Sequence, residues 1–353
     1  MSELVEMLSK ICPAGTDAGL AAERRWNEIA KPLGGLGLLE RAVVRMAAMT
    51  GTPDVDISRR AVVVMCADNG VVAEGVSQTG QEVTAVVTEN LSAGRSSVCR
   101  MAEVAGADVV PVDIGVARPV EGGRILQRNI RRGTGNIAKG PAMSREEAVR
   151  AVRTGAAIAR ELKEAGYTLL ATGEMGIGNT TTSAAVAAVL LGLEPEITVG
   201  RGAGLSAAGL AQKRLAVRRA IACNRPDPSD PVDVLAKVGG LDLAGLAGVF
   251  LGGALCRLPV LVDGVISAVA ALAAVRMCPA AGDYLLASHA SAEPAGDLVL
   301  RELGLSPLIR AGMRLGEGTG AVAAIPLLDM ALAVYREMPT FEETHIEAYQ
   351  PLE

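Results

Sequence analysis

The sequence predicts an α/β fold in which a parallel sheet of about six strands is covered by helices on both faces. Short β-branched runs alternate with helical patterns along most of the 353 residues, and such alternation is typical of strand–helix–strand units. The strand candidates are almost continuously apolar, as expected where both faces of a sheet are buried. Hydrophobic residues make up 50% of the chain but aromatic residues only 2%, which favours helices packed tightly on a sheet over a β-sandwich.

Five strand candidates share one feature, which is that each ends in small, polar or acidic residues. In chain order they are AVVVMCADNG (61–70), ADVVPVDIGV (107–116), YTLLATGEMG (167–176), LPVLVDGV (258–265) and DYLLASHA (283–290). Residues 197–200, ITVG, are expected as a sixth strand. Between these runs, residues 144–166 predict a helix, because Ser144 and Glu147 match a capping box and Gly166 ends the pattern.

Residues 243–275 are apolar enough to raise the question of a membrane span. Arg257 and Asp263 divide this segment into uncharged runs, each shorter than the roughly 20 residues that cross a bilayer. We therefore expect a buried helix, a buried strand and a second buried helix, and no membrane span. The first residues, MSELVEMLSKIC, carry charges early and lack a long apolar run, so no signal peptide is expected.

The two ends of the chain lie outside the strand–helix pattern and look helical. We expect them to form a small helical domain together, with residues 1–30 as its N-terminal part and residues 329–353 as its C-terminal part. Residues 31–328 then form a large α/β catalytic domain.

Composition and charge exclude several classes of function. The net charge of −5 provides no basic surface for nucleic acid. The six cysteines are scattered without a C-x-x-C pair, and the two histidines add no metal-ligand spacing. We therefore expect a cytoplasmic protein with reduced thiols, and neither a metal ion nor a cofactor.

The polar residues that end the strand candidates are expected to meet at one edge of the sheet. In an open parallel sheet, ligands bind beyond the carboxyl ends of the strands. The residues that this rule brings together are Asp68, Asn69, Asp113, Gly115, Glu174, Gly176, Asp263, Gly264, Ser288 and His289.

The stretch GEMGIGNTTTSAAVAAVLLG, residues 173–192, places glycines and polar residues between two apolar runs. Gly176 and Gly178 allow a ligand to approach the backbone, and the helix expected to begin near Thr180 directs its N-terminus to the same place. Backbone N–H groups and a helix dipole together favour an anion, most often a phosphate. A tight turn with threonine caps would explain the same residues, so the pattern alone leaves both interpretations open.

Two further glycine-containing clusters carry basic residues. VGRGAGLSAAGLAQKR contains Arg201 and Lys213, either of which could neutralise a phosphate. A solvated basic helix end is the alternative. In RNIRRGTGNIAKG we expect Arg131 and Arg132 to serve on the surface.

The motif GMRLGEGTGA places a carboxylate among glycines. Glu317 is flanked by Gly316 and Gly318 and lies near the apolar Leu315. A carboxylate that such neighbours shield from water can act as a general base. An exposed loop carboxylate is the commoner situation for a glutamate, and the motif by itself leaves both open.

The chain resembles the nicotinate-nucleotide:dimethylbenzimidazole phosphoribosyltransferase family of cobalamin lower-ligand assembly. The resemblance covers residues 34–330 and rests on motifs in the family's order: GEMGIGNTTTSAA, VGRG followed by Lys213, LPVLVDG, SHASAEP and GLSPLIRAGMRLGEGTGA. It implies transfer of the phosphoribosyl group of nicotinate mononucleotide to 5,6-dimethylbenzimidazole or a related base, giving α-ribazole 5′-phosphate and nicotinate with inversion at the anomeric carbon. It also implies a Rossmann-like sheet, a small helical domain from both chain ends, a homodimer, and small-molecule partners without nucleic acid or membrane.

The resemblance further implies roles for individual residues. Glu317 takes the proton of the incoming base, and Glu174 is a second catalytic carboxylate. The residues expected to bind the nucleotide and its phosphate are Gly176, Gly178, Asn179, Thr180, Gly202, Lys213, Asp263 and Ser291. The residues expected to bind the base are Ser77, Gln81, Met175 and Leu315.

Residues 75–103 depart from the family pattern, which leaves the acceptor base open. Ser77 and Gln81 match, but Thr79 and Gly80 stand where other residues are usual, and an aromatic residue is missing nearby, which reduces the surface for stacking. One alternative is the same fold acting on adenine or a phenol, with a partner subunit. The other is a non-catalytic nucleotide-binding regulator, against which the intact catalytic glutamate argues.

Overall fold

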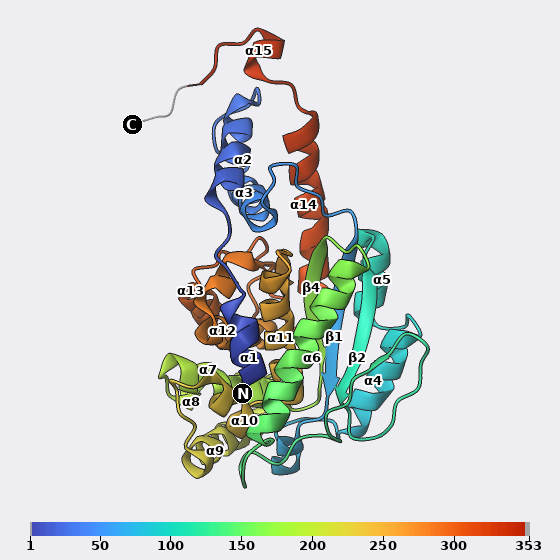
Figure 1. The fold of residues 1–353 in the computed structure, drawn as a ribbon. Coiled ribbons are helices and arrows are strands. Elements are labelled where there is room, and N and C mark those ends of the chain that lie inside the picture. The colour runs from blue at the N-terminus through green and yellow to red at the C-terminus, as the bar shows by residue number, and fades with distance from the viewer. Residues whose placement is uncertain (1, 350–353) are drawn as a thin grey trace.

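The computed structural model describes residues 2–349, and its core is a six-stranded sheet in which all paired strands run parallel (Figure 1). In sheet order the strands are β3 (Leu126–Gln127), β2 (Asp108–Gly115), β1 (Arg60–Ala67), β4 (Leu169–Met175), β5 (Val260–Val262) and β6 (Leu285–Ala287). The predicted α/β fold with about six parallel strands is confirmed, and each of the five strand candidates contains a strand.

The predicted sixth strand, residues 197–200, is wrong. Pro195–Thr198 form the short helix α8, with Pro195 in its first turn, where the fixed φ of proline suits a helix start. Thr198 Oγ1 donates to the carbonyl oxygen of Ala184 at 2.9 Å, which ties this turn to a neighbouring helix. The sixth strand is instead β3, which has two residues and is too short to be recognised as an apolar run.

Helices cover both faces of the sheet, as predicted. Helices α4 (Glu82–Ser92), α5 (Ser97–Ala105) and α14 (Thr319–Glu337) pack on one face. On the other face are α11 (Leu241–Leu255) and α12 (Val265–Met277), with α6 (Arg145–Glu164) packed against α11. Strand β1 shows the division, since Val62 lies against the start of α14 and Met65 against Gly245 of α11, and residues three apart on a strand point to opposite faces.

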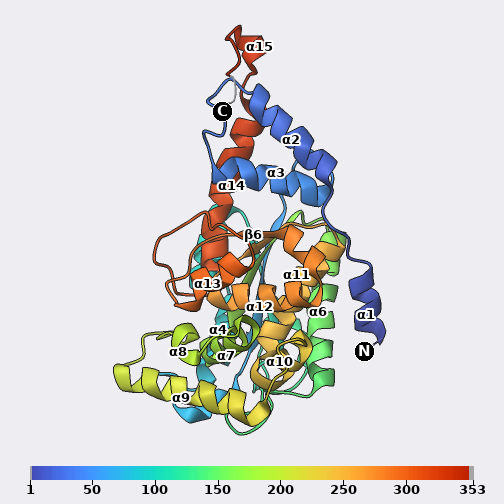
Figure 2. The same ribbon diagram turned by 90° about the vertical axis from the view of Figure 1, so that its left-hand side faces the viewer.

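The remaining elements lie beyond the two ends of the sheet or, for α1 and α13, against α11 and α12 (Figures 1 and 2). They are α1 (Ser2–Ser9), α2 (Thr16–Glu28), α3 (Leu38–Thr50), α7 (Asn179–Leu191), α9 (Ala207–Asn224), α10 (Pro231–Val238), α13 (Ala295–Glu302) and α15 (Phe341–Thr344), with the 3₁₀ turns η1 (Gly70–Glu74) and η2 (Pro279–Tyr284). Of these, α7 to α10 lie at the end of the sheet opposite to α2 and α3.

The strand order β3-β2-β1-β4-β5-β6 puts a topological switch between β1 and β4. The chain builds outward from β1 in one direction and from β4 in the other, so the connections leave these two strands on opposite sides. The ligand crevice of such a sheet lies beyond the carboxyl ends of the strands at the switch. Cys66 pairs with Met175 at this end, which brings Asn69, after β1, beside Gly176, after β4.

Helices α6 and α11 pack so closely that their backbones touch. A Cβ on Gly155 of α6 would lie 1.9 Å from the Gly245 carbonyl oxygen, and a Cβ on Gly248 of α11 would lie 1.9 Å from the Val152 carbonyl oxygen. Glycine at both positions therefore removes the side chains that would hold the two helices apart. Helix α6 also begins with the predicted capping box.

Helices α2 and α3 lie beside the outer half of α14 (Figure 2), and Ile29, after α2, forms an isolated bridge with Thr340, before α15. Helix α2 packs on α3, and the centroids of the Trp26 and Tyr335 rings are 5.1 Å apart. Helix α14 runs without a break through residues 328 and 329, and α1 packs separately on α11. The domain boundaries at residues 30 and 328 stay a prediction, and residues 350–353 of the predicted helical part lie outside the described residues.

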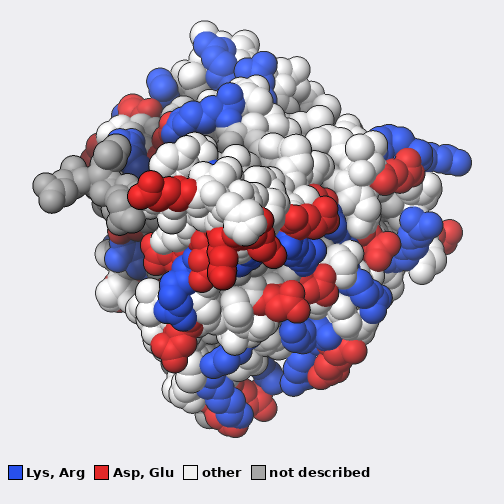
Figure 3. Space-filling model, turned by 90° about the horizontal axis from the view of Figure 1, so that it is seen from above, with Lys and Arg blue, Asp and Glu red and all other residues white. Residues whose placement is uncertain are grey.

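The apolar segment 243–275 forms α11, β5 and α12, and nearly all of its side chains are buried, which confirms the predicted buried helix, strand and helix. Among the described residues, α14 is the one helix long and apolar enough to cross a membrane by length and composition, and 56% of that window is buried inside the protein. The core helix of a soluble protein has the same properties. On the face shown in Figure 3, basic and acidic side chains are interspersed.

We expect Gly155→Ala to lower the free energy of unfolding by about 3 kcal/mol, the upper end of the usual cost of overpacking, because the added Cβ meets the backbone of α11. Urea unfolding followed by circular dichroism measures this change. Gly140→Ala adds the same methyl group where no atom lies within 4 Å and serves as the control. Equal stability of the two variants would contradict the close packing of α6 on α11.

Candidate active site

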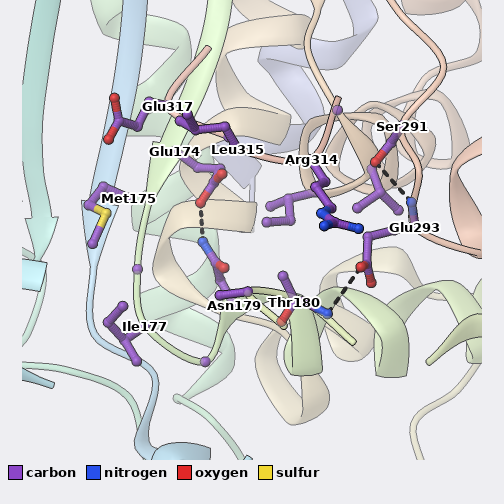
Figure 4. Close-up of a pocket in the computed structure, with 18 of the residues that line it drawn as sticks. Glu174, Met175, Ile177, Asn179, Thr180, Ser291, Glu293, Arg314, Leu315 and Glu317 are labelled. Atoms are coloured by element: carbon purple, nitrogen blue, oxygen red, sulfur yellow. Dashed lines mark hydrogen bonds between the residues drawn. The ribbon is translucent and has the colours of Figure 1, made fainter. Parts of the chain in front are cut away.

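A cavity opens beyond the carboxyl ends of β4 and β5, and of the residues to which the family resemblance assigns a role, all except Gln81 and Lys213 line it (Figure 4). The ends of β4, β5 and β6 therefore meet at one site, as predicted. Asn69, Gly115 and Ser288, which were also expected at this edge, are not part of its lining, and neither are Asp68 and Asp113, at the ends of β1 and β2. Their carboxylates accept hydrogen bonds from the backbone N–H groups of Ala117 and Val116, so they organise the loop that follows β2.

The loop from β4 to α7 needs its glycines. A Cβ on Gly176 would lie 2.3 Å from the Ala67 carbonyl oxygen, so no side chain fits there. Gly178 has a φ of 95° and occupies the N-cap position of α7 without any side-chain cap. The interpretation as a turn with threonine caps is therefore wrong, and the N-terminus of α7 is left open toward the cavity, as an anion site requires.

Thr180 and Gly202 line one end of the cavity, and the buried Lys213 lies directly behind them; these three residues are called the anion cradle below. Lys213 Nζ donates to Thr180 Oγ1 at 2.8 Å. Gly202 has a φ of 53°, and a Cβ there would lie 2.9 Å from Thr180 Oγ1 and 3.3 Å from Lys213 Nζ. The Gly202 backbone thus reaches a buried ammonium group that a larger residue would block.

The alternative of a solvated basic helix end is wrong for Lys213, whose side chain is fully buried. Burial lowers its pKa from 10.5 to about 8, and the charge of Glu293 acts in the opposite direction. A buried ammonium with one hydroxyl partner is costly without a counter-charge, and an anionic ligand beside it would lower that cost. Arg201 also lines the cavity, while its guanidinium donates to the Leu205 carbonyl oxygen at 2.6 Å.

Glu174 is a buried carboxylate in the middle of the cavity lining, between the two ends visible in Figure 4. It accepts a hydrogen bond from Asn179 Nδ2. Burial raises the pKa of Glu174 well above its ordinary value, and the charges of Asp242, Asp263 and Glu317 raise it further. Glu174 is therefore a carboxyl group that favours the neutral form until a positive charge arrives.

Asp263 and His289 form a buried pair at the end of β5. Asp263 Oδ1 accepts a hydrogen bond from Ala321 N of α14 at 2.9 Å and lies 3.9 Å from His289 Nδ1. Burial raises the pKa of Asp263, and His289 opposes that shift. The imidazole lies flat against Gly320, where a Cβ would be 1.8 Å from Nδ1, so the two loops that follow β5 and β6 are tied to the start of α14.

Glu317 reaches the same cavity because its loop crosses the end of β4. A Cβ on Gly173 would lie 2.4 Å from the Glu317 carbonyl oxygen, and a Cβ on Gly316 would lie 2.4 Å from Glu174 Oε1. Glu317 itself has a φ of 61°, and its Oε2 accepts a hydrogen bond from Val98 N at 3.2 Å. This N–H belongs to the first turn of α5, where the helix dipole favours a negative charge.

The strong desolvation expected at Glu317 is found at Glu174 instead. Glu317 is partly exposed and its neighbour Leu315 is 57% exposed, because the loop forms the open side of the cavity. Figure 4 shows Met175 and Glu317 at one end of the cavity, and Arg314, Glu293 and Ser291 at the other.

The residues predicted to bind the base fall into two groups, three that line the cavity and one that does not. Ser77, Met175 and Leu315 line the cavity. Gln81 lies behind them, and its Nε2 donates to the Asn69 carbonyl oxygen at 3.2 Å, so it positions the loop after β1.

Sequence reasoning missed three groups at the site. Arg314 and Glu293 line the cavity. They lie inside the motifs GLSPLIRAGMRLGEGTGA and SHASAEP, in which only Glu317 and Ser291 were predicted to act. Asp242 is fully buried, its Oδ2 has no hydrogen-bond partner, and burial raises its pKa from 3.8 to about 6. Asp242 opens an apolar helix, and no local sequence signal marks it as a neighbour of Gly176.

Two other expectations concern charged groups. Arg131 and Arg132 pair with Glu147 and Asp113, each at 3.2 Å, and stay partly exposed, which confirms their surface role. Within residues 2–349 there is no group of three or more His, Cys, Asp or Glu side chains that could hold a metal ion.

Comparison with known proteins gives a consistent result. A family model described as phosphoribosyltransferase matches residues 11–346. The chain is 51% identical over 329 residues to the nicotinate-nucleotide–dimethylbenzimidazole phosphoribosyltransferase of Acetivibrio thermocellus, covering 93% of this chain and 94% of that one. For the protein of the same name from Escherichia coli K12 the identity is 44% over 349 residues, with 98% and 97% covered. The crystal structure of CobT from Thermus thermophilus superimposes with a TM-score of 0.90 at 44% identity, covering 94% of this chain and 100% of that one.

We expect Asp242→Asn to stabilise the protein at pH 7.5 and not at pH 4. The pKa of Asp242 is about 6 in the folded protein against 3.8 ordinarily, so the folded state loses stability as pH rises from about 4 to about 6 and stays penalised above that. The asparagine removes a penalty of about 3 kcal/mol. Thermal unfolding of the variant and the wild type at both pH values measures this difference in stability. Asp54→Asn, on the exposed surface, is the control. Equal melting temperatures of Asp242→Asn and the wild type at pH 7.5 would contradict a buried ionised carboxylate at residue 242.

Proposed function

The chain belongs to the nicotinate-nucleotide–dimethylbenzimidazole phosphoribosyltransferase family, and from that membership we propose how its cavity performs the reaction. The enzyme transfers the phosphoribosyl group of nicotinate mononucleotide to 5,6-dimethylbenzimidazole in cobalamin assembly. The products are α-ribazole 5′-phosphate and nicotinate, and the configuration at the anomeric carbon is inverted because the base attacks the face opposite to the leaving nicotinate.

The anion cradle receives the 5′-phosphate of the nucleotide. The Gly202 N–H, the Thr180 hydroxyl and the Lys213 ammonium converge there, and the N-terminus of α7 adds its dipole. Asp263 and Ser291 line the wall beside the cradle, at a position suited to ribose hydroxyl groups. Anchoring the phosphate fixes the anomeric carbon relative to both carboxylates, and such positioning supplies much of the rate of a transfer reaction.

Glu174 faces the sugar. In nicotinate mononucleotide the glycosidic nitrogen belongs to a cationic pyridinium ring, so cleavage of the C–N bond neutralises the ring and leaves positive charge on the sugar, as in other oxocarbenium-like transfers. The raised pKa of Glu174 falls when this cation binds, and the ionised carboxylate then stabilises the charge that develops at the anomeric carbon.

Glu317 takes the proton of the incoming base. One ring nitrogen of the benzimidazole forms the new C–N bond, and the other gives its proton to the Glu317 carboxylate, whose Oε2 is held by Val98 N. Met175 and Leu315 contact the faces of the flat base. One observation carries this division of roles: Glu174 and Glu317 lie in one cavity with the anion cradle, because the glycines at 173 and 316 let two loops cross.

We also propose that the enzyme is a cytoplasmic homodimer that acts on small molecules without a cofactor. Val104 of α5 is 87% exposed and Met330 of α14 is 56% exposed, and these helices pack side by side. Large apolar side chains on adjacent helices are typical of a surface that a second subunit covers.

We expect the purified chain to release nicotinate from nicotinate mononucleotide with dimethylbenzimidazole, and Glu317→Gln to lower the turnover number by about 10² or more, the scale of a lost general base. Chromatographic separation of nicotinate and nucleotide products measures both. Glu23→Gln, on the exposed face of α2, is the control.

The same assay is run with adenine and with phenol as acceptors. Near-normal turnover of Glu317→Gln would show that Glu317 is not the group that accepts the proton of the base. Product formation with adenine or phenol but not with dimethylbenzimidazole would overturn the proposed acceptor, and nucleotide binding without product from any acceptor would point to a regulator.

We expect Lys213→Met to raise the KM for nicotinate mononucleotide at least tenfold with a small change in kcat, since it removes a contact to a group that does not react. Methionine keeps the buried volume without the charge. The nucleotide affinity of the wild-type protein should fall above about pH 8, because Lys213, with a pKa of about 8, loses its proton there. Titration calorimetry from pH 7 to 9.5 measures the affinity; Lys139→Ala, an exposed lysine, should retain the fall and Lys213→Met should lack it. A fall of the same size in Lys213→Met would place the titrating group elsewhere.

A further inference from the structure

The anion cradle holds a carboxylate of the protein itself. Glu293 Oε1 accepts a hydrogen bond from Gly202 N at 3.0 Å. The other oxygen, Oε2, packs on the backbone of Gly200, where a Cβ would lie only 2.0 Å away. Glu293 thus uses the backbone N–H group that an incoming phosphate needs, and the glycine at 200 makes room for it.

Glu293 compensates the buried lysine only from a distance. Within the described residues the Lys213 ammonium makes one hydrogen bond, to Thr180 Oγ1, and no carboxylate oxygen lies within the 4.0 Å of an ion pair. Glu293 is nevertheless the acid whose charge favours the protonated lysine. The Glu293 carboxylate therefore offsets the charge of Lys213 only in part, since it carries one negative charge and makes one hydrogen bond to the cradle.

We propose that Glu293 is an internal competitor for the 5′-phosphate, which occupies the anion cradle in the empty enzyme and leaves it when a nucleotide binds. This inference rests on the proposed assignment of the cradle to the phosphate. The Gly202 N–H cannot donate a full hydrogen bond to both groups, and two anions a few ångströms apart repel each other. The phosphate carries about two charges and three acceptor oxygens, so it displaces the single carboxylate.

The local structure allows Glu293 to leave. It lies in the loop between β6 and α13, where Ala292 and Pro294 are exposed. Its backbone is fixed by the N–H group, which donates to Ser291 Oγ at 3.3 Å, so a rotation of the side chain alone withdraws the carboxylate. In Figure 4 the Arg314 side chain lies at the same end of the cavity as Glu293 and points toward it. This exposed guanidinium is a partner for the displaced carboxylate that does not require the cradle.

Competition by Glu293 affects substrate and product alike, because both carry the 5′-phosphate. The apparent affinity for a ligand falls in proportion to the fraction of protein whose site is free to receive it. Glu293 therefore weakens nucleotide binding and shortens the residence time of the product. Glu293 thus affects the affinity for ligands that carry a 5′-phosphate, although it does not contact the reacting atoms.

The test compares the binding of three ligands to the full-length protein by titration calorimetry: inorganic phosphate, nicotinate mononucleotide and the corresponding nucleoside without phosphate. Glu293→Ala removes the competitor, and Glu293→Gln keeps its size while removing its charge. We expect both variants to bind phosphate and the mononucleotide about tenfold more tightly, as expected when a mostly occupied site is freed, and to bind the nucleoside as the wild type does. Glu194→Gln, on the exposed loop before α8, should leave all three affinities unchanged.

Unchanged or weaker phosphate binding in both Glu293 variants would overturn the inference while leaving the proposed function intact. Tighter binding of all three ligands would also overturn it, since the effect would then not concern the phosphate. If the wild-type protein bound neither phosphate nor the mononucleotide, or if Lys213→Met bound both as the wild type does, the assignment of the cradle would fail first, and this inference with it.

Discussion

The active site depends on one close approach of two backbones, that of residues 316–318 to the end of β4. Gly173 and Gly316 stand where a Cβ would collide with the Glu317 carbonyl oxygen or with the Glu174 carboxylate. The crossing also holds Glu317 in the left-handed region, with a φ of 61°, which non-glycine residues adopt rarely. Two carboxylates from distant parts of the chain are thereby fixed on one cavity, one toward the sugar and one toward the open side where a base can enter.

Burial of the ionisable side chains at the site determines their charge state. Burial raises the pKa values of Glu174, Asp242 and Asp263 and lowers that of Lys213, so every one of these groups is driven toward its neutral form in the empty protein. A ligand with a cationic ring at one end and a phosphate at the other supplies the charges that these groups lack. The site is therefore complementary to a nucleotide of this kind through desolvation as much as through contacts, and the Glu293 carboxylate occupies part of it in the meantime.

Much of the fold could be predicted because patterns of a few neighbouring residues indicate its strands and helices. Apolar runs that end in polar residues located five of the six strands, and the capping box located the start of α6. The segment ITVG failed because β-branched residues suggest a strand, whereas Pro195 starts a helical turn there. At the site, glycine-rich loops and one lysine were recognisable by type, but Glu293 and Asp242 were not. Their importance comes from burial and from neighbours far away in the sequence, which no local pattern records.

Five of the six strands, the parallel sheet and the set of loops that carry the chemistry follow from the sequence alone, since hydrophobic period, caps and glycine positions act over a few residues. Tertiary structure alone decided which of those loops meet, which carboxylate is desolvated and how Lys213 is buried. Desolvation and charge interaction depend on distances between segments that are separated by tens or hundreds of residues, and packing of the sheet fixes those distances. That is why the acid expected to be shielded, Glu317, is partly exposed, while Glu174 beneath it is the buried one.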